Sequence, residues 1–336
     1  MSQYTQNRLL DTNSSASAAT VHVSVIVCTR NRCDSLQATL ATIGQAVVPP
    51  GWKMEVLIVD NGSTDSTKSL VLSMSAGNAS LHYISEPRKG KCYAYNTGVS
   101  AAKGDIFLFT DDDVKVPVNW VEEMCRPITT GMADAVAGGV VFPPAVAAAL
   151  STPPLLWRRS WFASSEALDP KAPSRMIGAN MAFHRRVLQK VPGFDVELGP
   201  GALGFGDETL FSRQLLAAKY RLVGALDVTV EHHFDLSRLT NDKLLAAARD
   251  MGRTHAFVFH HWEHQRSRLF WLWFSICKIR RVWIRALKSM KGATRQQILL
   301  HELDIEKEHA FYSEYRVQTR RRQKYAFHGL SPISFE

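Results

Sequence analysis

Three consecutive aspartates, Asp111, Asp112 and Asp113, follow the apolar run 105–110. Like charges in a row repel one another, and burial raises their pKa values unless a cation compensates for the charge. Carboxylate oxygens are ligands that Mg²⁺ and Mn²⁺ prefer, and both ions also bind phosphate oxygens. The Asp111-x-Asp113 spacing therefore predicts a site for a divalent cation and a diphosphate. A solvated acidic turn is the alternative reading of the same residues.

Basic residues on neighbouring predicted loops favour the diphosphate reading, because guanidinium and ammonium groups neutralise phosphate charge. These residues are Arg30, Arg32, Arg88, Lys89 and Lys91. Asp60 precedes a turn led by Asn61-Gly62, and an acidic residue at such a strand end commonly accepts hydrogen bonds from a ribose or a base. Neither GxGxxG nor GxxxxGK[ST] occurs after the first predicted strand, which disfavours an ordinary dinucleotide or P-loop site.

The elements that must position these residues alternate between short apolar runs and amphipathic segments. Such alternation predicts a doubly wound α/β sheet, whose ligands lie at the carboxyl ends of the strands. The predicted strands span 23–28, 56–60, 81–84, 105–110, 135–142, 176–184 and 221–230, and the predicted helices span 34–45, 64–73, 90–102 and 207–219. Residues 143–174 read as an irregular loop or short helices.

Composition excludes several classes of protein. The 336 residues are 46% hydrophobic and 21% charged, which is the balance of a globular protein with a core. The five cysteines form no CxxC pair, so a zinc ribbon is excluded and a reducing environment fits best. Residues 265–336 hold 15 Lys and Arg against 6 Asp and Glu, whereas the rest holds 25 of each. A neutral body with a cationic tail argues against a nucleic-acid-binding core.

Several motifs together carry a family resemblance. Residues 23–32 read Val-Ser-Val-Ile-Val-Cys-Thr-Arg-Asn-Arg, residues 57–65 read Leu-Ile-Val-Asp-Asn-Gly-Ser-Thr-Asp, and residues 109–114 read Phe-Thr-Asp-Asp-Asp-Val. Later come Gly-Ala-Asn-Met-Ala-Phe at 178–183, Gly-Phe-Asp at 193–195 and Gly-Asp-Glu at 206–208. Over residues 21–235 the chain resembles the family 2 glycosyltransferases. It departs from them at Cys28, where they often have proline, and at Asp207-Glu208, which inverts their Glu-Asp pair.

The resemblance implies a GT-A fold, a Rossmann-like mixed sheet. The composition of the tail adds a helical basic extension at the C-terminal side. We expect a flexible segment at 1–20 and a catalytic domain at 21–264. That domain would divide into a nucleotide-sugar half at 21–115 and an acceptor half at 116–264. A basic amphipathic helical tail would follow at 265–336.

The resemblance also implies roles for individual residues. Asp113 would hold Mn²⁺ or Mg²⁺, with His232 as a second ligand or else as a structural histidine. Glu208 would be the general base, with Asp207 as the alternative, unless the pair only begins a helix. Asn180 would bind the acceptor, and the indole of Trp161 would either stack on a sugar or anchor the core. The residues expected around the nucleotide sugar are Thr29, Arg30, Arg32, Asp60, Gly62, Lys91, Asp111 and Asp112.

The expected activity is an inverting transfer of a sugar from a UDP-, GDP- or dTDP-sugar to a glycan or lipid-linked acceptor. A carboxylate must accept the proton of the acceptor hydroxyl, and cations must neutralise the departing diphosphate. Two rivals remain at this stage. A sugar-nucleotide pyrophosphorylase usually needs glycine in the loop at 29–32, which has none. A degenerate subunit that binds without catalysis would fit the inverted acidic pair.

The tail segment 265–290 combines Arg and Lys with Trp, Phe and Leu, which is typical of a helix at a membrane interface. Packing on the catalytic body or at a dimer interface is the alternative, and nucleic acid is disfavoured. The first twenty residues lack a hydrophobic signal core, and the longest apolar run of the tail is too short to span a bilayer. We expect a cytoplasmic protein with peripheral contact to the inner face of the membrane, and a solvated stretch at 320–324.

Overall fold

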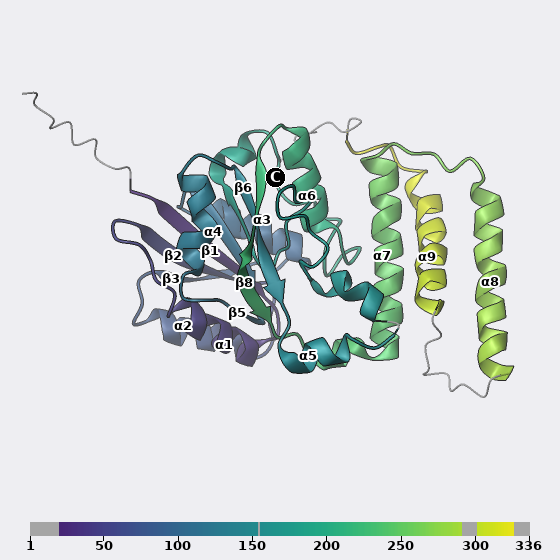
Figure 1. The fold of residues 1–336 in the computed structure, drawn as a ribbon, viewed down its shortest axis with the longest axis horizontal. Coiled ribbons are helices and arrows are strands. Elements are labelled where there is room, and N and C mark those ends of the chain that lie inside the picture. Colours follow the sequence, from purple (N-terminus) through teal and green to yellow (C-terminus); the bar gives the residue numbers. More distant parts are fainter. Residues whose placement is uncertain (1–19, 154, 291–300, 326–336) are drawn as a thin grey trace, which may run out of the picture.

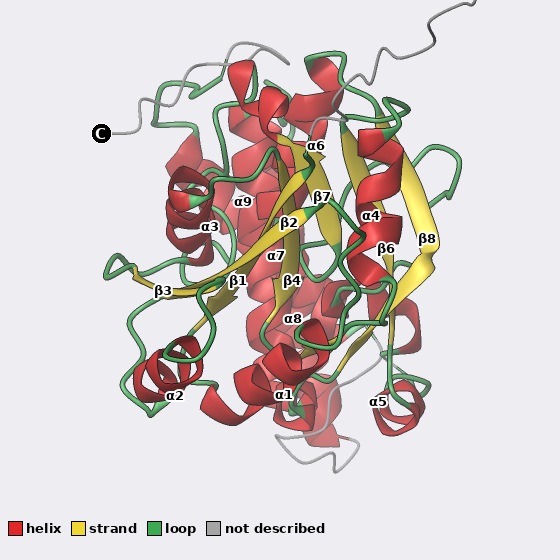
Figure 2. Ribbon diagram, turned by 90° about the vertical axis from the view of Figure 1, so that its left-hand side faces the viewer, coloured by secondary structure: helices red, strands yellow, loops and turns green. Residues whose placement is uncertain are grey.

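The computed structural model describes residues 20–153, 155–290 and 301–325. The predicted N-terminal segment 1–20 lies outside these residues except for Thr20. The described residues form an eight-stranded mixed sheet in the order β3-β2-β1-β4-β7-β6-β8-β5 (Figures 1 and 2).

The first half of the sheet is parallel, as the strand–helix alternation predicts. Its strands are β1 (His22–Thr29), β2 (Lys53–Asp60), β3 (Leu81–Ser85) and β4 (Ile106–Asp111). The helices between them are α1 (Cys33–Ile43), α2 (Thr67–Ser75) and α3 (Lys91–Ala101). Runs of Val, Ile and Leu are buried in β1 and β2 because helices cover a parallel sheet. The strands and helices predicted here are confirmed, with ends that shift by a few residues.

The second half of the sheet is mixed. Its strands are β5 (Val114–Lys115), β6 (Ala135–Val141), β7 (Met181–His184) and β8 (Leu222–His232). β7 runs antiparallel to β4 and β6, and β8 runs parallel to β6. The predicted strand 176–184 is confirmed only from Met181, because the preceding residues form a turn closed by the bond from Asn180 N to Ile177 O.

Helices and short 3₁₀ turns complete this half. They are α4 (Trp120–Thr129), α5 (Pro144–Ala149), η1 (Leu156–Phe162), η2 (Arg185–Gln189), α6 (Asp207–Ala217) and η3 (Leu236–Leu239). Short helices in the segment 143–174 agree with the sequence expectation. The loop between η2 and α6 has positive φ angles at all five of its glycines, which are Gly193, Gly199, Gly201, Gly204 and Gly206. Glycine suits these positions because other residues are strained there.

Three long helices lie side by side beyond the sheet: α7 (Asn241–His261), α8 (Phe270–Met290) and α9 (Glu302–Gln318) (Figure 1). α9 packs between α7 and α8, and α8 is the helix furthest from the sheet. At Gly252 of α7, an added Cβ would overlap the backbone oxygen of Lys307 in α9, so the two backbones are in close contact. None of the helices described is long and apolar enough to cross a bilayer.

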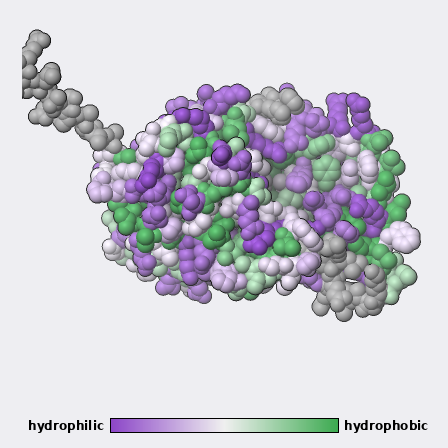
Figure 3. Space-filling view, viewed as in Figure 1, coloured by the Kyte–Doolittle hydropathy of each residue, from purple (hydrophilic) through white to green (hydrophobic). Residues whose placement is uncertain are grey.

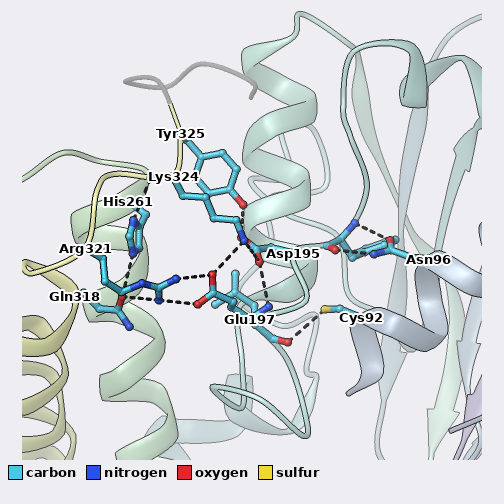
Figure 4. Close-up of polar contacts among 11 residues, drawn as sticks. Cys92, Asn96, Asp195, Glu197, His261, Gln318, Arg321, Lys324 and Tyr325 are labelled. Atoms are coloured by element: carbon cyan, nitrogen blue, oxygen red, sulfur yellow. Dashed lines mark hydrogen bonds and ion pairs between the residues drawn. The ribbon is translucent and has the colours of Figure 1, made fainter. Parts of the chain in front are cut away.

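The segment after α9 contacts the glycine-rich loop. Residues 320–323 are exposed, as expected for a solvated stretch, and Lys324 is half-buried. Arg321 pairs with Glu197, and Lys324 Nζ lies 2.7 Å from Asp195 Oδ1 (Figure 4). The Tyr325 hydroxyl donates to the other oxygen of Asp195, whose side chain is almost fully buried. These contacts fix the tail to the loop that leads into α6.

α3 holds the other side of the same loop. The side chain of Asn96 exchanges two hydrogen bonds with the backbone of Phe194, at 2.8 and 2.9 Å (Figure 4). The Cys92 thiol donates to Leu198 O, and Lys91 N donates to Pro200 O. The loop is therefore held between α3 and the tail.

Candidate functional site

The candidate site lies where β1, β2 and β4 end. Thr29 is paired in register with Asp60, and Cys28 is paired with Asp111. Three neighbouring strands therefore present polar side chains at one edge of the sheet. This is the arrangement that sequence reasoning predicts for a switch point of strand order.

Asp111, Asp113 and His232 form a compact cluster, in which one potential ligand atom from each lies within 4.8 Å of the others. His232 comes from the end of β8, and the short strand β5 brings it beside Asp113 because Val114 pairs with His232. The two residues are far apart in the sequence, so β5 is the element that closes the cluster.

The hydrogen-bond geometry of His232 fits a cation in this cluster. His232 Nδ1 lies 3.1 Å from Phe162 O, and it must donate there because a carbonyl only accepts. In a neutral imidazole, Nε2 then carries a lone pair, and it faces Asp113 Oδ1 at 3.2 Å. That buried oxygen has no other polar partner among the described residues. Two carboxylates and an imidazole lone pair fit a divalent metal ion.

Asp112 has a different environment from its two neighbours. Its oxygens accept hydrogen bonds from Thr29 Oγ1 at 2.7 Å and from Arg32 at 3.0 Å. Arg32 also contacts Asp113, so one guanidinium bridges both carboxylates. Burial raises the pKa of Asp112 to about 6, against the opposing charge of Arg32. The hydrogen bonds of Asp112 with Thr29 and Arg32 therefore stabilise the residues next to the cluster.

Lys91, the first residue of α3, links the acidic cluster to the acidic pair at α6. Its Nζ lies 2.7 Å from Asp111 Oδ1 and 3.9 Å from Glu208 Oε1. Burial lowers the pKa of Lys91, but the charges of Asp111, Glu208 and Asp207 together outweigh burial and raise the pKa well above its usual value, so the lysine stays charged. A cation thus stands between the two groups of carboxylates.

Glu208 and Asp207, both at the start of α6, differ in access. The Asp207 side chain is buried, and burial together with the charge of Glu208 raises its pKa well above the usual range. The Glu208 side chain is 20% exposed. A Cβ at Gly178 would overlap both the Glu208 carboxylate and the Tyr95 hydroxyl, so Gly178 leaves the space that Glu208 occupies. Glu208 is therefore the accessible member of the pair.

Asp60 and Gly62 lie at the end of β2. Asp60 accepts hydrogen bonds from Ser63 N and from the Tyr83 hydroxyl, both at 2.8 Å. Gly62 is exposed and has φ +76°, with open space where a Cβ would be. The neighbouring Asn61 side chain bonds the backbone of residues 86–90, which holds the loop before Lys91.

Arg30, Asn180 and Trp161 are three predicted site residues that make none of the contacts described above. Arg30 is exposed. The amide of Asn180 is fully buried and binds Trp120 Nε1, Gly139 O and Val228 O. This environment disagrees with an acceptor-binding role, because the amide is already saturated and has no access to a sugar. Trp161 is half-buried in a small core around Phe162 and Phe234, with the Arg158 guanidinium over its ring.

Two arginines that the sequence did not single out approach the site. Arg238 in η3 stacks its guanidinium over Phe234 at 5.2 Å, and burial lowers its pKa against the charge of Asp113. Arg175 is half-buried, and burial lowers its pKa against the charge of Glu208. Arg175 precedes the predicted strand 176–184 and Arg238 follows the predicted strand 221–230. Neither arginine belongs to a sequence motif. Only the fold shows that they face the carboxylates.

The sequence pattern of the family described as "Glycosyl transferase family 2" matches residues 24–192, which is half of the chain. The chain belongs to this family. Asp111 and Asp113 lie within the matched range, whereas His232 and the acidic pair of α6 lie beyond it.

Named relatives are similar over part of their length. Glycosyltransferase AglE of Haloferax volcanii is 34% identical over 121 residues, which are 36% of this chain and 40% of that protein. Succinoglycan biosynthesis protein ExoM of Rhizobium meliloti is 29% identical over 122 residues, 36% of this chain and 39% of that protein. The matched part of the chain thus spans about two fifths of these two relatives.

Solved structures show the same fold. Mannosyltransferase PcManGT from Pyrobaculum calidifontis, in complex with GDP-Man and Mn²⁺, superposes with a TM-score of 0.54 at 19% identity, covering 89% of this chain and 86% of that one. S. aureus TarS gives a TM-score of 0.51 at 16% identity, with 91% and 56% covered. The GT-A fold with C-terminal helices is therefore confirmed.

Proposed function

We propose that the protein is an inverting glycosyltransferase that moves a sugar from a nucleoside-diphosphate sugar to a hydroxyl of a glycan or lipid-linked acceptor. The observation that carries this proposal is the single lysine, Lys91, that stands between Asp111 of the cation cluster and Glu208. A donor diphosphate held at the cluster and an acceptor hydroxyl at Glu208 would then meet across a short gap.

The donor would be held by residues of the parallel half-sheet. Asp60 lies at the strand end where ribose or base recognition is usual in such sheets. Lys91, Arg32 and Arg238 surround the carboxylates with positive charge, which suits a diphosphate. Arg30 and Gly62, exposed residues of two neighbouring loops, belong to the same proposed surface.

Asp111, Asp113 and His232 would hold the metal ion. Their mixed oxygen and nitrogen donors suit Mn²⁺ better than Mg²⁺, which prefers oxygen alone. When bound, the ion supplies charge stabilisation for the departing diphosphate. PcManGT was solved with GDP-Man and Mn²⁺, which supports the proposal by analogy of fold.

Glu208 would be the general base. The acceptor oxygen attacks the anomeric carbon as the bond from that carbon to the phosphate oxygen breaks, and the hydroxyl proton passes to the Glu208 carboxylate. One displacement inverts the anomeric centre. Asp207 serves this role less well, because its buried and protonation-prone carboxyl has no access to an acceptor.

We propose that the chain divides into two catalytic halves and a helical tail. The donor half would span 21–115, the acceptor half 116–264, and the helical tail 265–336. The tail would give the enzyme peripheral contact with the inner face of a membrane. Family membership and an accessible Glu208 both disfavour a pyrophosphorylase or a non-catalytic subunit.

The test is sugar transfer measured with a panel of nucleotide sugars, with and without Mn²⁺. For Glu208→Gln we expect turnover to fall by about a hundredfold or more at unchanged donor affinity. Asp207→Asn is the paired variant. If Asp207→Asn alone stops turnover, the general base is Asp207 and not Glu208. Donor binding without any turnover in the wild-type protein would indicate the non-catalytic alternative.

A further inference from the structure

One face of α8 is apolar and has no partner among the described residues. Exposed fractions on this face reach 65% at Trp271 and 64% at Trp283. Ile279, Val282 and Met290 share the same side of the helix and are also exposed. Figure 3 shows hydrophobic residues gathered along this edge of the molecule, over α8.

The opposite face of α8 explains why the apolar face points outward. Phe274, Cys277 and Ile284 are buried, at the spacing of one helical face. On the same side Arg281 pairs with Glu306 of α9, and Lys288 pairs with Glu302. The charged pairs orient α8 on α9, so the tryptophan-bearing side faces away from the catalytic body.

Cations border the apolar face. α8 contains no Asp or Glu. Lys278 and Arg285 lie on one flank of the face and form no ion pair with another described residue. Arg266 and Arg268, just before the helix, are exposed and likewise pair with no described carboxylate. Unpaired cations beside tryptophans are the composition of a helix that lies flat in a membrane interface.

A groove that contains arginine side chains lies beside the start of α8, and it is a second cationic feature next to the apolar face. It has a volume of about 370 Å³ and combines aromatic walls with two arginines. Its lining residues are Phe270, Trp271, Tyr315, Arg316, Thr319 and Arg320. Guanidinium groups over an aromatic floor suit a phosphate group attached to an apolar chain.

We infer that α8 docks the protein flat on a bilayer of anionic phospholipids, with Trp271, Ile279 and Trp283 inserted among the headgroups and acyl chains. Charge complementarity selects this occupant over a second copy of the chain. A dimer through this face would bring the cations of two α8 helices to one interface, with no carboxylate on either helix to compensate. The inference goes beyond the proposed catalysis, and its test needs no enzymatic activity.

The test is flotation of the full chain with phosphatidylcholine vesicles that contain or lack phosphatidylglycerol, at low and high salt. We expect binding to the anionic vesicles that weakens with salt. Lys278→Gln with Arg285→Gln should weaken partitioning by about thirtyfold, from the attraction of two cations to an anionic surface. Ile279→Glu with Trp283→Glu should abolish it.

Val118→Glu is the matched control, because Val118 is 61% exposed but lies on the catalytic body. It should bind vesicles like the wild type, and all variants should melt at the wild-type temperature. Equal binding to neutral and anionic vesicles would overturn the inference, as would wild-type binding by Ile279→Glu with Trp283→Glu. A dimer in light scattering that this double variant dissociates, without vesicle binding, would assign the face to a second copy.

Discussion

At the scale of single residues, the three adjacent aspartates 111–113 have different environments. Asp112 is turned toward Thr29 and Arg32, whereas Asp111 and Asp113 face His232. The sequence predicts the acidic cluster from its spacing, but it does not show which oxygens turn inward. That choice depends on the side chains of Thr29 and Arg32, which come from a different strand and its following loop.

Asp113→Asn should weaken Mn²⁺ binding at least about a hundredfold, because it removes a charged ligand from the cluster. Calorimetric titration of Mn²⁺ in the presence of a nucleoside diphosphate measures the effect. Asp112→Asn is the control from the same triplet and should change the affinity by less than about tenfold. The ligand assignment fails if the two variants lose equal affinity while both remain folded.

Arg238→Ala should weaken binding of the nucleoside diphosphate by about ten- to a hundredfold. Its charge faces the carboxylate cluster, and a hydrogen bond to a charged group is worth about 1.5–3 kcal/mol. Titration with UDP and GDP measures this directly. Arg126→Ala on the surface of α4 should leave affinity unchanged. Wild-type affinity in Arg238→Ala would remove this residue from the proposed donor site.

At the scale of elements, the sequence predicted the parallel half-sheet well because its signal is local. Buried strands are short runs of Val, Ile and Leu, and each begins and ends within a few residues of its prediction. β5 escaped prediction because two residues form a strand only through pairing with β8. The prediction that Asn180 binds the acceptor rested on its polar side chain and its motif. In the structure, the turn before β7 buries this side chain among backbone carbonyls.

The contact between the tail and the glycine-rich loop was also beyond sequence reasoning, because it joins residues more than 120 positions apart. Tyr325→Phe should destabilise the protein by about 1–3 kcal/mol, since it removes a donor from the buried carboxylate of Asp195. Chemical denaturation measures the free energy of unfolding. Tyr312→Phe on α9 is the control and should change it by less than about 0.5 kcal/mol. Equal stability of the two variants would contradict the importance of this bond.

At the scale of the whole molecule, the last helices are part of the packed body. α9 lies against α7 through close backbone contact at Gly252, and α8 is attached through α9. A cut after residue 264 would therefore expose the α7 surface that α9 covers. Single substitutions on the outer face of α8 isolate its function better than removal of the tail.

Gly252→Ala should destabilise the protein by roughly 2 kcal/mol, because its Cβ would overlap the Lys307 carbonyl oxygen and force α7 and α9 apart. The melting temperature should fall by several degrees. Gly77→Ala is the matched control, since an added Cβ there meets nothing within 4 Å. A Gly252→Ala protein as stable as the wild type would show that the two helices adjust without cost.

The bonds from Arg321, Lys324 and Tyr325 to the loop before α6 also set an order of events during translation. The ribosome delivers the N-terminal part of a chain first, and that part folds as it emerges. The half-sheet and its carboxylate cluster can form while residues 318–325 are still inside the exit tunnel. The nascent chain can therefore complete its proposed donor pocket before the loop that leads into α6 is held by the tail, so the support of α6 and its Glu208 is complete only after these late residues emerge.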